Sequence, residues 1–576
     1  MLKPIAHRRA RDRWLLALLT ALLIMAVTYA LCRPIYETND DSSIVAAASG
    51  AVTGVPYAGN GFTSYLYGAL LAGLFSLNAN LPWHALFLLG VAFLSLAALI
   101  KCFACMGARF RVPCLALWAV PGGLYAGVLM PYVAMLQFTT IATLAAAGGT
   151  ALLLCAGSGR GHAARFDRGI AGVLLLCAFA LRVQSLWAAM PLLAAYGVLA
   201  WLESPRSGRK TALCCGVALA LLGLLTAADS ALYRHNEPGW DAFCVFNDRL
   251  SDLLDYNNTD LVDELAAEAA GWPPWTTYMV RNWYQLDEHM MLDGLTVLTD
   301  AIAEAKPAPT AASLLRATGS VLLRYPMFAF TLAGFGLFAL WAFFAQALRR
   351  RFWDCLAILG PAVYLVVFIA YFYGVLGRLP ERAAFTAACP CYVLLALSCL
   401  RAFAPGAERG ERLSRRLGSA AACALALLCA VPAAADASAR LPLRWQEQSR
   451  DAARALSGRM CAYACAHPDR VYVTDAPLDH DPFYVYGDAL PVNLIEWCNG
   501  MFHSPMYQEK LHVLGFDSFT SRTLLEEGVY LLLSGEGVLN NLQGYLAAEY
   551  GPVSVELLYR GDGFLECVLR PAPQPA

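Results

Sequence analysis

The chain has 576 residues, of which 59% are hydrophobic and 15% are charged, and its formal net charge at pH 7 is -1. Soluble proteins carry about 25% charged residues, so this composition excludes an ordinary soluble domain and predicts an α-helical polytopic membrane protein. A net charge near zero supplies no field that would attract nucleic acid, and we expect no nucleic-acid partner.

The first apolar run, residues 14–32, is long enough to cross a bilayer as a helix. The arginine-rich segment before it is expected to stay in the cytoplasm. Residues 33–83 then form a first outer loop, which carries Glu37, Asp40 and Asp41 close to the membrane surface. A carboxylate held there suits a general base that acts on a lipid-borne substrate. The competing interpretation is an acidic pair at the start of a solvated loop.

Within this loop, residues 62–78 are apolar enough to resemble another span. Counting them as a span would invert every later loop and place the basic loops outside, against the positive-inside rule. We therefore expect an interfacial or re-entrant helix at this place.

Ten further apolar runs follow, which gives about eleven transmembrane helices with the first. They fall near residues 84–104, 113–130, 132–155, 169–184, 186–202, 211–228, 320–345, 355–374, 383–400 and 417–435. Every loop expected on the cytoplasmic side is basic, as the positive-inside rule requires. The sequence thus predicts a multi-pass protein of the cell membrane with a cytoplasmic N-terminus and an extracytoplasmic C-terminus.

Two outer regions differ in character from the expected transmembrane domain, residues 1–436. Residues 229–313 form a large outer loop with helical stretches, and its aromatic residues Trp272, Trp275, Trp283 and Tyr284 suit a membrane interface. Residues 437–576 alternate strand-like and helix-like runs, which predicts a small C-terminal extracytoplasmic α/β domain. The strand-like runs are 471–474, 529–533 and 564–569, and the helix-like runs are 449–466 and 538–550.

An acidic loop after the first span, an interfacial helix, about eleven spans and an outer α/β tail together resemble the GT-C superfamily. These are integral-membrane glycosyltransferases that use polyprenyl-phosphate sugars, such as the protein O-mannosyltransferases and the aminoarabinose transferases. Residues 37–41, followed by 50–56 and 65–68, resemble the family's first outer loop, where an acidic residue acts as base toward the acceptor hydroxyl. Residues 377–390 resemble its late loop and span, where cationic side chains meet the donor phosphate. The His-Pro-Pro and Trp-Trp-Asp motifs of other members are missing, so subfamily and acceptor stay open.

An inverting glycosyl transfer needs a carboxylate to deprotonate the acceptor and cations to stabilise the leaving phosphate. The candidates for the carboxylate are Asp40, Asp41 and Glu37, with Asp40 favoured slightly as the nearer of the two aspartates to the span. The candidates for the phosphate contacts are Arg378, Arg382 and Arg182.

Each cationic candidate has a competing interpretation. Arg378 and Arg382 could only anchor the neighbouring spans by snorkelling, or be neutralised by Glu381 between them. Arg182 could mark the water-facing tip of a hairpin between the spans at 169–184 and 186–202.

Metal and disulfide chemistry are less well defined by the sequence. Asp475, Asp479, His480 and Asp481 could hold a hard cation, but the flanking prolines favour a solvated loop. We predict no certain cofactor, with a divalent cation as the alternative. Most of the 19 cysteines lie in or beside apolar runs, where cysteine acts as a small hydrophobe. Pairing is conceivable only among the outer ones, Cys244, Cys461, Cys465, Cys498 and Cys567.

The combined expectation is an inverting glycosyltransferase of the membrane. It would move a sugar from a polyprenyl-phosphate carrier to a glycan, lipid or protein acceptor of the cell envelope, on the outer face and among membrane lipids. The alternatives are a transporter or flippase of a lipid-linked glycan and a non-catalytic envelope assembly protein. A transporter would predict charged residues deep in several spans, and those are scarce here.

Overall fold

The structure, a computed structural model, describes residues 10–157, 159, 161–255, 259–405, 411–435, 441–447, 450–487 and 489–572. Contacts divide the chain into two compact units, and each unit is assembled from three separate segments. Unit 1 comprises Met1–Glu37, Ala85–Ala228 and Pro309–Glu447, and unit 2 comprises Thr38–His84, Asp229–Ala308 and Gln448–Ala576. Both loops that the sequence places outside therefore fold together with the C-terminal tail.

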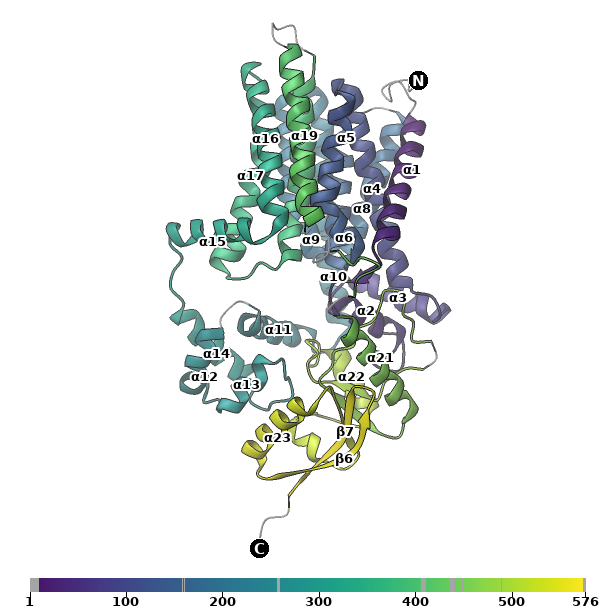
Figure 1. The fold of residues 1–576 in the computed structure, drawn as a ribbon, viewed down its shortest axis with the longest axis vertical. Helices are drawn as coiled ribbons and strands as arrows, with labels where there is room; N and C mark the ends of the chain where they lie inside the picture. The colour runs from purple at the N-terminus through teal and green to yellow at the C-terminus, as the bar shows by residue number, and fades with distance from the viewer. Residues whose placement is uncertain are drawn as a thin grey trace. The chain divides into compact units, whose positions relative to one another are not determined.

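Unit 1 is built of long apolar helices that run side by side (Figure 1). Within the described residues, ten helices are long and apolar enough to cross a membrane, which makes the chain a multi-pass membrane protein. They are α1 (Ala10–Leu31), α4 (Trp83–Phe110), α5 (Cys114–Leu124) continued through η2 (Tyr125–Leu129) and α6 (Met130–Ala134), α7 (Phe138–Ala156), α9 (Val183–Glu203), α10 (Pro205–Asn236), α16 (Pro326–Leu348), α17 (Phe352–Ile369) continued by η3 (Ala370–Val375), α18 (Glu381–Leu400) continued by η4 (Arg401–Phe403), and α19 (Glu411–Ala435).

The predicted span that is not among these ten, near residues 169–184, corresponds to α8 (His162–Leu181), a helix of 20 residues. It falls short of a span by composition because Arg165, Asp167 and Arg168 lie in its first two turns. The predicted break before the next span is confirmed, since α8 ends at Leu181 and α9 begins at Val183 around an extended Arg182.

The centre of unit 1 is formed by α7 and α18, which are the most buried of the ten helices. Small residues, Ala145 to Gly149 on α7, allow neighbouring backbones to approach closely. By contrast α1 and α10 expose leucine side chains along most of their length, as helices that face lipid do. A further helix, α15 (Ala311–Arg324), is amphipathic and packs on η3.

In unit 2, the apolar residues expected to stay out of the membrane core form α3 (Tyr65–Leu77). Its 13 residues make a helix about 20 Å long, shorter than the roughly 30 Å hydrocarbon core of a bilayer. Ser64 caps it by accepting a hydrogen bond from the Tyr67 amide. The helix is therefore too short to span.

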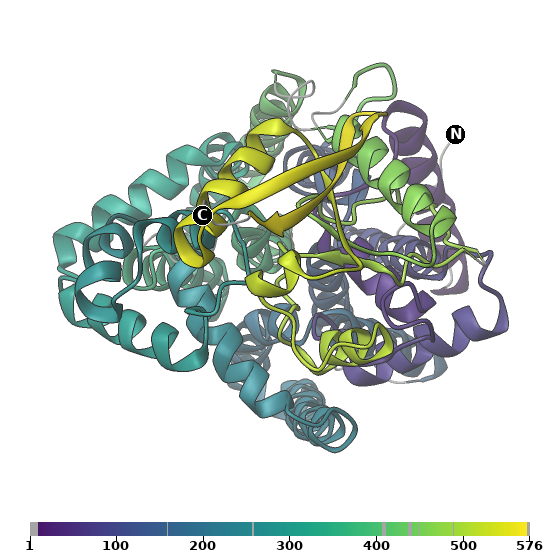
Figure 2. The ribbon, with the colours of Figure 1, turned by 90° about the horizontal axis from the view of Figure 1, so that it is seen from below.

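The tail contains a five-stranded mixed sheet with the strand order β4-β3-β5-β7-β6. β3 is parallel to β4 and β5, whereas β7 is antiparallel to β5 and β6. Figure 2 shows β6 and β7 as the two long arrows of the sheet. The strands are β3 (Val471–Thr474), β4 (Leu494–Glu496), β5 (Val529–Leu533), β6 (Val553–Gly561) and β7 (Phe564–Pro571), and the helices are α21 (Asp451–Ala466), α22 (Pro505–Val513), η5 (Ser521–Leu525) and α23 (Glu536–Tyr550). The predicted mixed α/β fold is confirmed, and β4, β6 and α22 are additions to it.

The remaining part of unit 2 is a small helical layer with its own apolar core. It consists of α11 (Trp240–Leu254), α12 (Thr259–Ala270), α13 (Pro274–Arg281) and α14 (Leu292–Ala305). Trp272 and Tyr284 are buried here, so the expectation that this aromatic run lies at a membrane interface is wrong for these two residues. Their rings contribute to packing because the helices of this layer need large side chains to fill a shared core.

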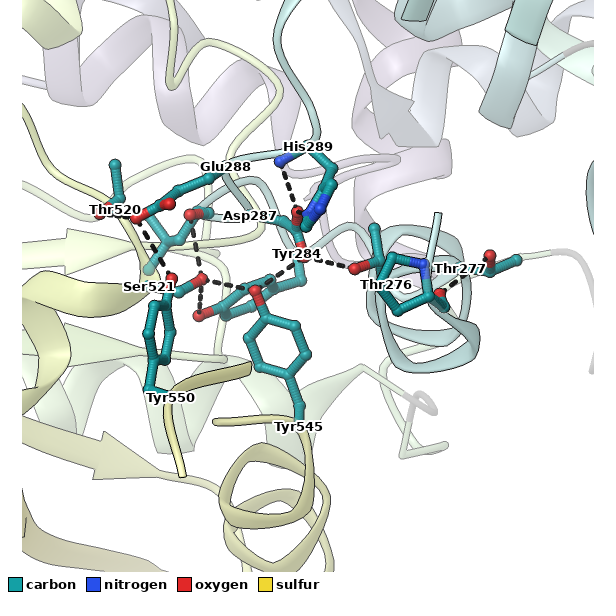
Figure 3. A network of polar contacts seen from close by, with 12 residues as sticks. Thr276, Thr277, Tyr284, Asp287, Glu288, His289, Thr520, Ser521, Tyr545 and Tyr550 are labelled. Carbon is teal, nitrogen blue, oxygen red and sulfur yellow. Dashed lines mark hydrogen bonds and ion pairs between the residues drawn. The ribbon is translucent and has the colours of Figure 1, made fainter. Parts of the chain in front are cut away.

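A buried polar network joins this helical layer to the tail (Figure 3). Asp287 accepts hydrogen bonds from the Thr276 hydroxyl at 3.0 Å and the Tyr545 hydroxyl at 2.7 Å. Ser521 lies 2.9 Å from both the Tyr284 and the Tyr545 hydroxyls. Buried polar groups that are fully bonded fix one arrangement of the segments that carry them.

Candidate functional site

The acidic pair of the first loop opens a short helix, α2 (Asp40–Ser49). Asp40 and Asp41 occupy its first turn, where the helix dipole favours negative charge. Gly50 ends the helix with φ at 88°, and a Cβ there would lie 2.9 Å from the Val55 carbonyl carbon. Glycine is therefore required at this turn, and it fixes how far the helix extends beyond the acids.

The two aspartates differ in their surroundings. Asp40 is half-buried, whereas Asp41 is 0% exposed. Asp41 Oδ1 lies 2.9 Å from Nε2 of His84, and Nδ1 of the same ring lies 2.8 Å from the Tyr67 hydroxyl. Because an ionised carboxylate only accepts, His84 then donates from Nε2 and accepts from Tyr67 at Nδ1. The result is a continuous chain of hydrogen bonds from α3 to α2.

The tail of unit 2 contacts the same helix one residue further on. The His480 amide donates to the Ser42 hydroxyl at 3.0 Å. Burial lowers the pKa of the His480 imidazole to about 4, and its ring stacks on Tyr484 at 4.0 Å between centroids. His480 is therefore neutral at pH 7, and its link to α2 is a backbone contact that carries no charge.

The rest of the first loop is anchored to residues 229–237. The Tyr57 hydroxyl donates to Glu237, and Asp229 accepts from the Tyr65 amide at 2.8 Å. The Tyr233 hydroxyl donates to the Thr63 carbonyl at 2.9 Å. Burial raises the pKa of Glu237, while the Tyr57 hydrogen bond lowers it. These contacts hold α3, and with it Tyr67, in a fixed place.

Glu37, the third acidic candidate, lies in unit 1 directly after a short strand. β1 (Ile35–Tyr36) pairs in parallel with β2 (Met135–Leu136), and the Glu37 amide donates to the Leu136 carbonyl at 3.3 Å. The next residue after β2, Gln137, caps α7 by accepting from the Thr140 amide at 3.1 Å. Glu37 is thus placed beside the N-terminal end of α7.

Arg182 lies at the same end of unit 1. Its guanidinium is 5.4 Å from the centroid of Phe138, the first residue of α7, a cation–π distance. The Ser185 hydroxyl donates to the Thr139 carbonyl at 3.2 Å, which ties the start of α9 to the start of α7. Arg182 is half-buried.

Arg378 and Arg382 follow the wide π-helical turn η3. Gly377 makes the turn with φ at 87°, and the Arg378 amide donates to the Phe372 carbonyl at 3.1 Å. Both arginines are half-buried. Glu381, which begins α18, accepts from the Tyr132 hydroxyl at 2.9 Å, so this acid has a partner besides the arginines that flank it in sequence.

The structure gathers four of the six predicted residues at one end of unit 1. The starts of α7 and α9 meet there, because Ser185 contacts Thr139. The start of α18 meets α6 directly before α7, since the ring centroids of Phe385 and Tyr132 are 3.9 Å apart. The four residues are Glu37, Arg182, Arg378 and Arg382. Asp40 and Asp41 belong to unit 2 and follow Glu37 by three and four residues along the chain.

Sequence reasoning missed His84 and Tyr67. Tyr67 fell inside a patch noted for its resemblance alone, and His84 opens the second long apolar run. A histidine on the first turn of a span is the signal that could have been used, since an ionisable residue at a membrane boundary indicates a functional site. Its pairing with Asp41 across 43 positions requires the fold.

The cluster suggested as a cation site has other partners. Asp479 is buried and pairs with Arg450, while Asp475 accepts from the Ser534 amide at 2.8 Å. The expectation of a solvated loop is therefore wrong for Asp479 and His480, because both side chains are buried and Asp479 is also ion-paired. Across the described residues, no group of three or more His, Cys, Asp or Glu side chains could hold a metal ion. All 19 cysteines are free, so the structure contains none of the conceivable disulfides.

The fold defines a helical, multi-pass membrane protein with a mixed α/β sheet in its C-terminal part. No protein-family model and no curated protein matches the chain. Among solved structures, the crystal structure of ArnT from Cupriavidus metallidurans bound to undecaprenyl phosphate is similar at 12% identity, with a TM-score of 0.38 over 97% of this chain and 99% of that one. At this identity the similarity assigns no activity, substrate or residue to this chain.

Proposed function

We propose that the chain is an inverting glycosyltransferase that moves a sugar from a polyprenyl-phosphate carrier to a cell-envelope acceptor. The acceptor is a glycan, lipid or protein on the outer face of the membrane, with the N-terminus in the cytoplasm and residues 437–576 outside. The observation that supports this most is the sequence of charges after the first span. Glu37 lies at the end of unit 1 that carries three half-buried arginines, and the acids of α2 follow within four residues.

Asp40 acts as the base in this proposal. It is half-buried and therefore reachable by an acceptor hydroxyl, whereas Asp41 is fully buried. Asp40 takes the hydroxyl proton while the acceptor oxygen forms a bond to the anomeric carbon. The bond from that carbon to the phosphate oxygen breaks on the opposite face, and the polyprenyl phosphate leaves with the electron pair.

Asp41 is a positioning residue in this scheme. Its bond to His84 fixes the first turn of α2, and the Tyr67 hydroxyl fixes the His84 ring in turn. A base held within a fraction of an ångström keeps the geometry that general-base catalysis needs.

Arg182, Arg378 and Arg382 receive the charge that develops on the leaving phosphate. Arginine binds phosphate through two parallel hydrogen bonds, which strengthen as negative charge accumulates. These three arginines lie at the end of unit 1 where α9 and α18 start. That place suits a phosphate whose hydrocarbon chain stays in the bilayer.

The direct test uses the purified full chain in liposomes with polyprenyl-phosphate sugars and a membrane extract as acceptor source. Release of unglycosylated polyprenyl phosphate, together with inversion at the anomeric carbon, is the expected result. Asp40→Asn should slow the release by about a hundredfold to ten-thousandfold while leaving donor binding intact. Movement of an intact donor across the vesicle membrane without release of its sugar would instead establish the flippase alternative.

A further inference from the structure

Unit 1 contains a cavity of about 200 Å³ between α4, α7, α9, α10, α17 and α18. It lies at the end of the bundle opposite to Arg182. Helix α9 starts beside Arg182 and contributes Tyr196 and Glu203 to the cavity, so the cavity is about 20 Å further along that helix. In Figure 1 this is the end of unit 1 where α1 begins.

The inner part of this cavity is apolar. Its walls include Ala151, Leu154, Leu394 and Leu397. The Tyr196 hydroxyl is occupied, since it donates to the Ala357 carbonyl at 2.5 Å and lies 3.0 Å from the Ser398 hydroxyl. With its polar groups already bonded, this part suits hydrocarbon better than water.

The mouth of the cavity carries two arginines with different surroundings. Arg401 is neutralised, because it pairs with Asp354 at 2.9 Å and with Glu203. Arg109 has no carboxylate partner in the part of the chain that the structure describes, and its guanidinium lies 5.3 Å from the ring of its neighbour Phe110. Among the described residues that line the cavity, Arg109 is therefore the one cation without a carboxylate partner.

Hydroxyl groups lie at the same mouth, at the start of α10. The Ser204 and Ser207 side-chain oxygens are 2.6 Å apart, and both residues line the cavity. The first amides of α10 also face this region, since the helix begins at Pro205. Amides at a helix start, hydroxyls and an arginine are the donors that bind a phosphate group.

We propose that this cavity binds an anionic phospholipid, with its phosphate at Arg109, Ser204 and Ser207 and the start of one acyl chain against the apolar walls. The chemistry combines a single unpaired cation with a hydrocarbon-lined interior, which is what an amphiphile of net charge -1 requires. This lipid site is independent of the proposed glycosyl transfer and does not rest on it.

The test is native mass spectrometry of the full chain in detergent with added dioleoylphosphatidylglycerol, dioleoylphosphatidylcholine or inorganic phosphate. Phosphatidylglycerol is expected to bind most tightly, because choline neutralises the phosphate and inorganic phosphate lacks the chain. Arg109→Ala should weaken phosphatidylglycerol binding about tenfold to a hundredfold, the usual loss of a hydrogen bond to a charged group. Arg109 is exposed, so the fold should survive the change.

Two further variants make the result specific. Ser207→Phe fills the mouth without altering charge and should also weaken phosphatidylglycerol binding. Arg165→Ala is the matched control, since Arg165 is an exposed arginine of the neighbouring helix α8 that contacts His162 and does not line the cavity. Equal affinity for the two phospholipids, or unchanged binding in both Arg109→Ala and Ser207→Phe, would overturn the proposal. Saturable inorganic phosphate binding of the same strength would reassign the cavity to free anions.

Discussion

Two of the adjacent acidic pairs in unit 2 each contain a buried aspartate and yet differ in their surroundings. Asp40 and Asp41 open α2, and Asp287 and Glu288 lie between α13 and α14. Each pair has one buried aspartate, Asp41 at 0% and Asp287 at 2% exposed. Each buried aspartate also has a histidine and a tyrosine nearby, so residue types alone do not separate them.

The hydrogen bonds separate them. Asp287 receives donors from several directions, with His289 contributing its amide at 2.7 Å beside the hydroxyls of Thr276 and Tyr545 (Figure 3). Glu288 accepts from the hydroxyl of Tyr550 at 3.2 Å. The Thr520 hydroxyl, directly before η5, donates to Glu288 at 3.2 Å as well. Donors that converge from α13, α23 and the residue before η5 make this pair a junction between segments.

The α2 pair is organised along a line instead. Asp41 is hydrogen-bonded to His84, and His84 is hydrogen-bonded to Tyr67. Asp40, the residue before Asp41, is half-buried. A line of this kind fixes one carboxylate and leaves its neighbour reachable, which is the arrangement a general base needs. Under the proposed function, the direction from which donors reach the acids, and not the adjacency of two acids, distinguishes a reactive pair from a structural one.

The largest effect is expected from Asp40→Asn, which keeps the shape of the side chain and removes the proton acceptor. Sugar transfer should fall by about a hundredfold to ten-thousandfold, measured as release of polyprenyl phosphate under single-turnover conditions. Glu288→Gln is the matched control and should stay within about threefold of the parent chain, as for surface changes generally. Full activity in Asp40→Asn and in the double variant with Asp41→Asn would remove the α2 pair from the chemistry.

The next largest effect is expected at the arginines that we assign to the phosphate. Alanine at Arg378 or Arg382 should lower transfer by about tenfold to a hundredfold, because a charge-assisted donor to the leaving group is lost. Lysine keeps the charge without the planar fork and should be impaired as well. If these arginines only anchor the spans by snorkelling, replacing them with lysine should leave activity unchanged. Donor binding and turnover equal to those of the parent chain in all four variants would therefore support the anchoring interpretation.

A smaller effect is expected from His84→Ala, since this residue acts on the base only through Asp41. Turnover should fall by about tenfold, the cost of one hydrogen bond to a charged group, while KM for the donor stays unchanged. The pH profile of turnover should change, because Asp41 loses the imidazole nitrogen that lies 2.9 Å from its Oδ1. His84→Gln retains a donor at the reach of Nε2 and should recover part of the activity. A loss of turnover with an unaltered pH profile would indicate a purely structural role.

The smallest effect on turnover is expected from Asp287→Asn, the counterpart in the structural pair. Its donors come from different segments, so their loss should destabilise unit 2 by about 1–3 kcal/mol, read as a lower midpoint of thermal unfolding. Turnover of the folded fraction should remain within about twofold of the parent chain. A folded Asp287→Asn variant without activity would erase the distinction between the two acidic pairs.

Much of the fold could be predicted because apolar length and charge are local properties of the chain. The break around Arg182, the short helix at 65–77 and strands β3 and β5 all follow from runs of a few residues. The missed elements have weak local signals. β4 has only three residues, Leu494–Glu496, and becomes a strand because β3 offers a parallel partner.

The candidate site was only half predictable for the same reason. Acids and arginines stand out in an apolar chain, so Asp40, Asp41 and Arg378 could be selected by type and position. His84 gains its meaning from a contact across 43 positions, and Trp272 was misplaced because an aromatic residue in a loop suits a buried core and an interface equally well. The His84–Asp41 contact cannot be read from the sequence because the two residues are far apart in the chain. The burial of Trp272 cannot be read from it because both environments favour the same residue type.

The wide turn η3 affects the direction in which the chain carries Arg378 away from α17. A π-helical turn accommodates one residue more than an α-helical turn, and each residue of a helix rotates the chain by about 100°. Because the wide turn holds one extra residue, deleting a single residue from Ala370–Val375 would let it rewind as α-helix with the exit at Gly377 on the same side of the bundle. Deleting a second residue would exceed that allowance and rotate the exit by about 100°. The direction of Arg378 therefore tolerates the loss of one residue from this turn and not the loss of two.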